Sequence, residues 1–314
     1  MSSNSTRIPL LIDTDPGVDD ALALLMAFAS PGHEVIGLTI AAGNVGLPHT
    51  VANALKLCEV AGVDVPVYPG CPVQLLRPAP DASHVHGLDG FGDVGYLPAR
   101  QTAEAEHAAL AIIRLSHRHA GRLLLVMLGP LTNLALALRL DPGLPDRLGR
   151  VVVMGGAVTG QGNITPWAEF NFAFDPEAAH VVLEFLPGID LIDWEAVLGH
   201  SFPRADMERW LGADHPHARF YGVISRRFRD WLARERGDRG HAADSLAMAA
   251  ALAPEAVVEW ARRPLCIALE GPARGASLVD WQRQSGQPDN ARILRSFDQL
   301  RFEEMIRRGL GVPE

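Results

Sequence analysis

Four aspartates lie within eight residues near the start of the chain, directly after an apolar run. The segment reads Ile8-Pro-Leu-Leu-Ile-Asp-Thr-Asp-Pro-Gly-Val-Asp-Asp-Ala-Leu-Ala-Leu-Leu25, and its acids are Asp13, Asp15, Asp19 and Asp20. The pattern predicts a buried strand over Ile8 to Ile12, a tight turn and an apolar helix. Four carboxylates on one turn repel one another strongly unless a cation lies among them. Hard oxygen ligands favour Ca²⁺ or Mg²⁺ over zinc, so the turn indicates a metal site.

A purely structural role would explain only some of these acids. Asp19 and Asp20 would favour the N-terminus of the helix through its macrodipole, and Asp13 could be an ordinary turn residue. That interpretation gives no reason for the remaining carboxylate. The metal site is therefore the better interpretation of the turn.

Strand-like and helical runs alternate through the first two-thirds of the chain. Predicted strands cover Glu34–Ala42, Val65–Tyr68, Leu123–Leu128, Arg150–Met154 and Ile189–Ile192, and predicted helices cover Thr50–Ala61, Glu104–Ala120, Leu131–Arg139 and Asp175–Phe185. Such alternation implies right-handed crossovers between parallel strands. The predicted fold class is α/β, with an open, mainly parallel, Rossmann-like sheet flanked by helices.

The remaining segments are predicted to elaborate this sheet. Residues 202–252 have a mostly helical pattern, and the chain beyond Pro254 mixes short strands with a terminal helix near Asn290 to Arg308. Residues 69–101 and the segment from Met154 to Phe174 lack a convincing element, and loops this long are usually functional. No internal repeat or clean linker divides the chain, so we expect residues 1–314 to form a single domain with a helical elaboration near the C-terminus.

Composition excludes several functional classes. The chain has 314 residues, is 48% hydrophobic and carries a formal net charge of −9, which argues against a nucleic-acid partner. Its cysteines, Cys58, Cys71 and Cys266, have no CxxC spacing and are not expected to form a disulfide framework or a zinc site. No stretch is long or apolar enough to predict a signal sequence or a membrane span. We expect a soluble, cytoplasmic protein.

Polar residues follow each of four predicted strands at its carboxyl end. They are Asp13 and Asp15 after the first, Gly43-Asn44 after the second, Thr132-Asn133 after the strand at 123–128, and the loop Asn163–Asn171 after the next. Each alone could be a turn or a helix cap. In a parallel sheet, however, these ends share one edge, which is where open α/β sheets bind ligands.

These residues resemble the nucleoside hydrolases of the inosine-uridine-preferring group. The matching segments are Asp13-Thr-Asp-Pro-Gly-Val-Asp-Asp-Ala21, Ala42-Gly-Asn44, Val85-His-Gly-Leu-Asp-Gly-Phe-Gly92, Leu128-Gly-Pro-Leu-Thr-Asn133, Met154-Gly-Gly156, Gly162-Asn163, Ala168-Glu-Phe-Asn171, Asp175-Pro-Glu-Ala-Ala179 and Asp244-Ser-Leu-Ala247. The resemblance extends from near Pro9 to near Leu310, and the whole set in this order is highly specific.

The resemblance implies a function and a set of site residues. The expected substrate is a small-molecule ribonucleoside, which is hydrolysed to free base and ribose, and the expected assembly is a homodimer or homotetramer. The expected metal is Ca²⁺, held by Asp15, Asp20, the backbone carbonyl of Thr132 and Asp244. The residues expected to bind the sugar are Asp19, Asn44, His86, Asn163, Glu169 and Asn171, and Asp15 is expected to take a proton from the attacking water.

The chemistry of N-ribosyl hydrolysis calls for such residues. The transition state resembles an oxocarbenium ion, so the sugar gains positive charge while a poor nitrogen leaving group departs. A metal would fix the ribose diol and acidify the water, and the carboxylates would stabilise the developing charge. Amide side chains would orient the sugar through directional hydrogen bonds.

The chain departs from the family pattern where the base should leave. Asp244 is usually preceded by a histidine or tryptophan, whereas here Ala243 precedes it, and Trp194-Glu195 replaces the usual Val-Thr. The candidates for protonating the base are His241, Glu195 and His84, of which His241 is preferred because an unperturbed imidazole titrates near neutrality. His241 and Glu195 could also be structural, and the departures leave the preferred base open.

Other functions fit the sequence less well. A strand ending in Asp-x-Asp also occurs in haloacid dehalogenase-type phosphatases, but their chemistry needs a downstream lysine, and the only lysine is Lys56 within a predicted helix. An EF-hand loop beginning at Asp13 would need glutamate at the position of Leu24. A nucleoside-binding protein without turnover would not need Asp15, Asp20 and Asp244 together.

Overall fold

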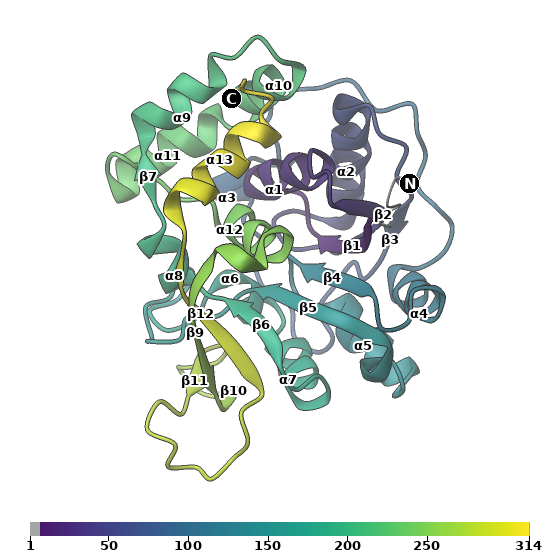
Figure 1. The fold of residues 1–314 in the computed structure, drawn as a ribbon, viewed down its shortest axis with the longest axis vertical. Helices are drawn as coiled ribbons and strands as arrows, with labels where there is room; N and C mark the ends of the chain where they lie inside the picture. The colour runs from purple at the N-terminus through teal and green to yellow at the C-terminus, as the bar shows by residue number, and fades with distance from the viewer. Residues whose placement is uncertain (1–6, 314) are drawn as a thin grey trace, which may run out of the picture.

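A computed structural model, which describes residues 7–313, is built around one eight-stranded sheet (Figure 1). The strand order is β3-β2-β1-β4-β5-β6-β12-β9, and all neighbours are parallel except β12 and β9. The strands are β1 (Ile8–Thr14), β2 (His33–Ile40), β3 (Val67–Pro69), β4 (Leu123–Met127), β5 (Leu148–Met154), β6 (Ile189–Ile192), β9 (Val257–Arg263) and β12 (Ala291–Phe297). The predicted α/β class with a mainly parallel sheet is confirmed.

Helices cover both faces of this sheet, as buried parallel strands require. One layer contains α1 (Val18–Phe28), α2 (Leu47–Ala61), α12 (Ala243–Leu252) and α13 (Gln299–Gly309), and the other contains α4 (Ala108–Arg118), α5 (Thr132–Leu140) and α7 (Pro176–Phe185). Alternate strand residues enter opposite cores, so that Val126 packs with the first layer and Leu125 with the second.

The remaining elements extend this framework at its ends. The helical elaboration between β6 and α12 contains α8 (Trp194–Gly199), α9 (Arg204–Leu211), α10 (Pro216–Ile224) and α11 (Arg226–Arg236). Other short elements are α3 (Ser83–His86), α6 (Phe170–Phe174), and the pairs β7 (Phe202–Pro203) with β8 (Arg239–Gly240) and β10 (Leu265–Ile267) with β11 (Ser277–Val279). Across residues 7–313, no helix combines the length and apolar character needed to cross a membrane.

The predicted terminal helix was wrong in its first half. Residues 291–297 form β12, which lies between β6 and β9, and α13 begins only at Gln299 after the Asp298 cap. Arg292 and Arg295 have a spacing that suits a helix, but Arg292 pairs with the buried Asp190 of β6 at 2.5 Å. Pairing with two strands outweighs the local pattern.

The carboxyl ends of the central strands meet at one edge of the sheet. Just beyond β1 the backbone pairing continues, because Ala41 N–H donates to the Thr14 carbonyl and Leu128 N–H donates to the Asp13 carbonyl. The turn that carries Asp15 is therefore held between the segments that follow β2 and β4. Helices α1 and α12 pack against each other beside this edge.

Candidate active site

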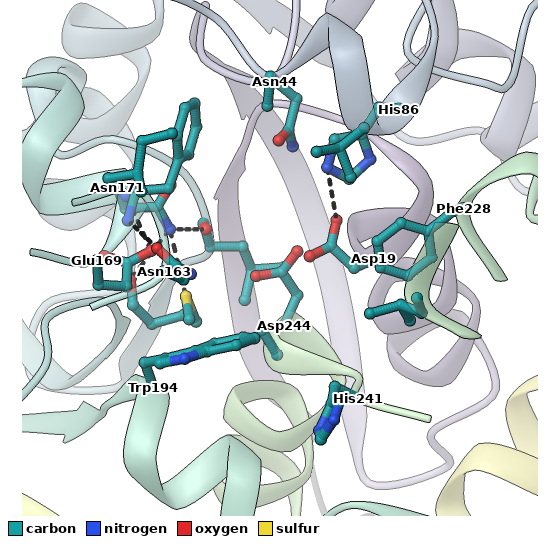
Figure 2. Close-up of a pocket in the computed structure, with 18 of the residues that line it drawn as sticks. Asp19, Asn44, His86, Asn163, Glu169, Asn171, Trp194, Phe228, His241 and Asp244 are labelled. Atoms are coloured by element: carbon teal, nitrogen blue, oxygen red, sulfur yellow. Dashed lines mark hydrogen bonds and ion pairs between the residues drawn. The ribbon is translucent and has the colours of Figure 1, made fainter. Parts of the chain in front are cut away.

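A cavity opens at the carboxyl edge of the sheet, beside the first turns of α1 and α12 (Figure 2). Nine of the candidate site residues named from the sequence line it: Asp19, Asn44, His84, His86, Asn163, Glu169, Asn171, His241 and Asp244. Asp15 and Asp20 do not line the cavity, and each is at most 1% exposed. Thr132 and Glu195 also lie outside its wall.

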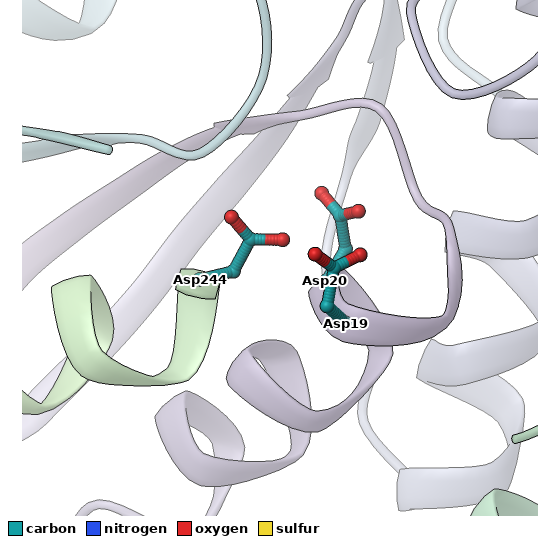
Figure 3. A group of neighbouring side chains, drawn as sticks. All are labelled: Asp19, Asp20 and Asp244. Carbon is teal, nitrogen blue, oxygen red and sulfur yellow. The ribbon is translucent and has the colours of Figure 1, made fainter. Parts of the chain in front are cut away.

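Three carboxylates converge at this cavity from the beginnings of two helices (Figure 3). Asp19 and Asp20 are in the first turn of α1 and Asp244 is in the first turn of α12, and each offers an oxygen within 4.8 Å of the others. The Oδ1 atom of Asp19 is buried and has no hydrogen bond within the described part of the chain. An all-oxygen donor set of this kind fits a hard divalent cation.

Asp15 lies next to this cluster in a cradle made of backbone. Its Oδ2 atom accepts a hydrogen bond from Asn44 N–H at 2.7 Å. A Cβ atom at Gly43 would stand 2.1 Å from one Asp15 oxygen, and one at Gly129 would stand 2.4 Å from the other, so both positions require glycine. The cluster of neighbouring oxygens thus contains Asp19, whereas the sequence-based ligand set contains Asp15.

Burial raises the pKa of each of these acids. The pKa of Asp19 is raised to about 6 by burial. Burial, followed by the charge of Asp20, raises the pKa of Asp15, and burial, followed by the charge of Asp19, raises that of Asp244 well above its usual range. A bound cation would reverse this effect because it favours the ionised carboxylates. The crowding therefore supports a cation site on electrostatic grounds as well.

The turn between β4 and α5 brings Leu128 to the cavity, whereas the carbonyl predicted as a ligand belongs to Thr132. Thr132 opens α5, and its hydroxyl donates to Asp175 at 2.8 Å. Leu128, the first residue after β4, lines the cavity instead, and its carbonyl accepts a hydrogen bond from the Asn171 side chain at 2.6 Å. The structure thus brings Leu128, and not Thr132, to the wall that contains Asn171.

One wall of the cavity consists of amide and carboxyl side chains from the β5–α7 connection (Figure 2). Glu169 caps α6 by accepting hydrogen bonds from Asn171 N–H at 2.8 Å and Phe172 N–H at 3.2 Å, and it also binds Gly156 N–H at 2.9 Å. The Oδ1 atom of Asn163 accepts from Phe170 N–H at 2.8 Å. Burial raises the pKa of Glu169 to about 7. Backbone hydrogen bonds therefore orient the polar side chains of this wall.

His86 lies across the cavity from this wall (Figure 2). Its Nδ1 atom accepts a hydrogen bond from Val18 N–H at 3.1 Å, its Nε2 atom lies 3.9 Å from Asp19 Oδ1, and its ring stacks on Phe228 with centroids 5.5 Å apart. Burial lowers the pKa of His86 to about 4. The imidazole is therefore neutral at physiological pH and forms a polar part of the cavity wall.

Comparison with known proteins identifies the family of this chain. The profile of the family described as inosine-uridine preferring nucleoside hydrolase matches residues 10–304. The chain belongs to that family. It is therefore a hydrolase that acts on N-ribosyl bonds.

Curated relatives and solved structures match between about half and nearly all of this nucleoside hydrolase chain. A probable uridine nucleosidase 1 of Oryza sativa is 35% identical, with 92% of this chain and 91% of the relative covered. The pyrimidine-specific ribonucleoside hydrolase RihB of Escherichia coli is 41% identical over 58% of each chain. Among solved structures, a plant nucleoside hydrolase (PpNRh1) has a TM-score of 0.90 at 28% identity, with 97% of this chain and 99% of that chain covered. An inosine-guanosine nucleoside hydrolase has a TM-score of 0.89 at 29% identity, with 98% and 99% covered.

The three candidates for the leaving-group acid have different positions in this nucleoside hydrolase. His241 and His84 line the cavity, and the His241 ring centroid lies 6.2 Å from that of Trp194. Glu195 does not line it, and its carboxylate binds residues 158–161 instead. Although burial opposes the effect, hydrogen bonds with Asp193 and Thr159 hold the pKa of Glu195 below its usual value. The expected substrate contact of Glu195 has no support from this geometry.

Two aromatic residues of the cavity were missed by sequence reasoning. Phe228 and Trp231 of α11 both line it, and their rings stack with centroids 6.3 Å apart. The available signal was their spacing of three residues on a helix otherwise rich in arginine. Lys56 pairs with Glu59 on α2 and does not line the cavity. The lysine of a haloacid dehalogenase-type phosphatase would have to lie in the active site, so the position of Lys56 argues against that function.

Proposed function

We propose that the chain hydrolyses the N-glycosidic bond of ribonucleosides to free base and ribose, with a bound Ca²⁺ ion. The observation that carries this proposal is the convergence of Asp19, Asp20 and Asp244 on a cavity with a hydrogen-bonding wall and an aromatic wall. A nucleoside has the same two halves, a polyhydroxylated sugar and a flat base. The proposed occupant therefore matches the cavity in chemical character.

The proposed ligands of the ion are the carboxylates of Asp15, Asp20 and Asp244 and one backbone carbonyl. Leu128 is better placed than Thr132 to supply this carbonyl, because Leu128 lines the cavity. Asp20 is already oriented by hydrogen bonds from Thr14 at 2.5 Å and Gly17 N–H at 2.9 Å. A bound Ca²⁺ would supply positive charge that holds the ribose diol and acidifies the attacking water.

Asp15 is the proposed general base. Without the ion, burial and then the charge of Asp20 raise the pKa of Asp15. In the Ca²⁺-bound site, Asp15 is proposed to accept the proton of the attacking water. Asn44 N–H fixes the Oδ2 oxygen of Asp15, and Oδ1 is proposed to receive that proton. The geometry of a base is thus set before substrate binds.

The ribose is proposed to lie between the two polar walls. Asn163, Glu169 and Asn171 would bind its hydroxyls from one side, and Asp19, Asn44 and His86 from the other. As the sugar becomes cationic, the nearby carboxylates stabilise its charge without reorganising. The neutral His86 adds no opposing positive charge at this point.

The base is proposed to lie against the aromatic residues Trp194, Phe228 and Trp231, with His241 as its proton donor. Aromatic faces stack on purines and pyrimidines alike. Such stacking suits both the pyrimidine and the purine substrates for which the relatives are named. We also propose a homodimer or homotetramer, which sedimentation of the purified protein would test.

A panel of ribonucleosides tests the proposed function. Inosine, uridine, guanosine and cytidine are incubated with the Ca²⁺-loaded protein, and free ribose is measured with a reducing-sugar assay. Ribose release from at least one of them, lost in the Asp15→Asn variant, is expected. If no nucleoside releases ribose while Ca²⁺ binds and the protein is folded, the assignment of the reaction is wrong.

A further inference from the structure

The carboxylate of Glu195 organises a surface turn next to the cavity. Its Oε2 atom accepts a hydrogen bond from Val158 N–H at 2.8 Å. Its Oε1 atom accepts from the N–H and hydroxyl of Thr159, both at 2.8 Å, and from Gln161 N–H at 3.2 Å. One side chain thus accepts hydrogen bonds from three backbone N–H groups and one hydroxyl of residues 158–161, which we name the 158–161 turn.

The same turn is anchored from the C-terminal part of the chain. Trp281 Nε1 donates to the Val158 carbonyl at 3.0 Å, and Ala157 N–H donates to the Ser277 hydroxyl at 3.3 Å. The guanidinium groups of Arg263 and Arg295 lie 5.5 and 5.1 Å from the centre of the Trp281 ring. The turn is therefore fixed on two sides, and Glu195 supplies most of the hydrogen bonds.

The 158–161 turn is connected to the cavity at both of its ends. Before it, Gly156 donates its N–H to Glu169 at 2.9 Å and accepts a hydrogen bond from Trp194 N–H at 2.9 Å. After it, Asn163 follows Gln161 by two residues and lines the cavity. A displacement of the turn would therefore move the wall that contains Asn163 and Glu169.

We propose that Glu195 is a positioning residue for the sugar side of the site, acting by fixing the 158–161 turn and thereby placing Asn163 and Glu169. The inference rests on the proposed function, because it takes those two residues as ribose contacts. A carboxylate suits this position because it only accepts hydrogen bonds, whereas an amide would present an N–H₂ group to a backbone N–H. Glu195 does not line the cavity, so it touches no substrate itself.

The Glu195→Gln variant tests this role. Because Thr159 and Gln161 are exposed, water can hydrate the released N–H groups, and the variant is expected to fold. We expect KM for nucleosides to rise about tenfold. The glutamine amide can accept fewer hydrogen bonds from the turn than the carboxylate does, and a loss of this kind costs free energy on that scale. The inhibition constant of free D-ribose should rise by the same factor, because the sugar wall is what moves. The factor should also be equal for inosine, uridine and p-nitrophenyl riboside.

Two further variants separate positioning from other effects. Thr159→Val removes one of the four hydrogen bonds to Glu195 and should raise KM by less than Glu195→Gln does. Glu184→Gln removes an exposed carboxylate of α7 and should leave both constants unchanged.

The outcomes distinguish this role from its alternatives. If Glu195→Gln loses turnover with nucleosides but not with p-nitrophenyl riboside, and ribose inhibition is unchanged, Glu195 is a proton donor and the positioning role is wrong. Unchanged KM and ribose inhibition would also overturn it. If the wild-type protein cleaves no nucleoside, the proposed function is wrong. The role of Glu195 is then tested by ribose binding, measured by calorimetry. An unchanged ribose affinity in Glu195→Gln would reject the positioning role.

Discussion

Asn44 binds Asp15 through two hydrogen bonds of different origin. The backbone N–H of Asn44 donates to Asp15 Oδ2 at 2.7 Å, and its side-chain amide donates to the Asp15 carbonyl at 3.1 Å. The same amide nitrogen reaches Asp20 Oδ2 at 2.9 Å. A single residue in the segment after β2 therefore orients two of the acids that we propose as metal ligands.

The Asp15→Asn variant should fold normally but lose most of its turnover. Asparagine keeps the shape of the side chain and an acceptor for Asn44 N–H, while it cannot take a proton from water. General-base catalysis contributes about 10²- to 10⁴-fold, so kcat should fall by at least that range. Steady-state kinetics and a thermal melt of the same preparation measure the two effects. A variant with near-wild-type kcat would place the general base elsewhere.

Removal of metal should lower both stability and activity. Without an ion, the carboxylates of Asp19, Asp20 and Asp244 repel one another. Unfolding separates them and relieves this repulsion, so the metal-free protein is less stable. Binding of Ca²⁺ to the folded state alone stabilises it by about 2.7 kcal/mol at a hundredfold excess over Kd. Thermal unfolding after chelation and after Ca²⁺ addition measures the change.

The Asp244→Asn variant provides the specific test of that site. It should lose the Ca²⁺-dependent rise in Tm, whereas Asp146→Asn, the same change at an exposed carboxylate before β5, should retain it. Equal stabilisation of both variants by Ca²⁺ would mean that the ion binds away from this cluster.

Much of the site was predictable because its residues lie in the segments that follow the carboxyl ends of strands. The end of a buried strand is fixed by its hydrophobic run, and parallel strands place their ends together. Asn44, Asn163 and Asn171 could therefore be assigned to one cavity before any coordinates were known, and all three line it. The aspartate turn after β1 was predictable for the same reason.

The errors arose where distant contacts override local pattern. Residues 291–297 form a strand because β6 and β9 pair with them, and nothing in their own sequence specifies those partners. Glu195 follows a strand end in the same way as Asn44, yet its side chain binds the 158–161 turn. A position after the carboxyl end of a parallel strand predicts that a residue lies near the cavity. The direction of its side chain depends on the loops around it.

Stability should depend on pH through His86. Burial lowers the pKa of His86 to about 4, from an ordinary value of 6.5. Between these values the unfolded chain binds a proton that the folded chain does not, so stability falls as pH falls from 6.5 towards 4. His86→Gln retains an acceptor for Val18 N–H without a titrating group, and it should lose less stability than the wild type over this range. Urea unfolding at pH 7 and pH 5 measures the difference, and parallel losses in both proteins would exclude this contribution.

His241 is the proposed proton donor to the departing base, a role that this chain must fill without a histidine next to Asp244. His241 lines the cavity beside Trp194, whereas Glu195 is occupied by backbone donors. His241→Ala should therefore reduce kcat for inosine or uridine by about 10²-fold or more, the usual contribution of general-acid catalysis. His84→Ala, which changes another histidine of the same cavity, should have a much smaller effect.

The comparison of two substrates decides whether this loss reflects proton transfer. The p-nitrophenolate group departs without a proton, so p-nitrophenyl riboside should be cleaved by His241→Ala at nearly the wild-type rate. Equal losses with both substrates would show that His241 only supports the cavity wall next to Trp194. A larger loss in His84→Ala than in His241→Ala, seen with nucleosides alone, would transfer the role to His84. The pH profile of kcat for the nucleoside should accordingly lose its alkaline limb in the variant that lacks the acid, because that limb reports its deprotonation.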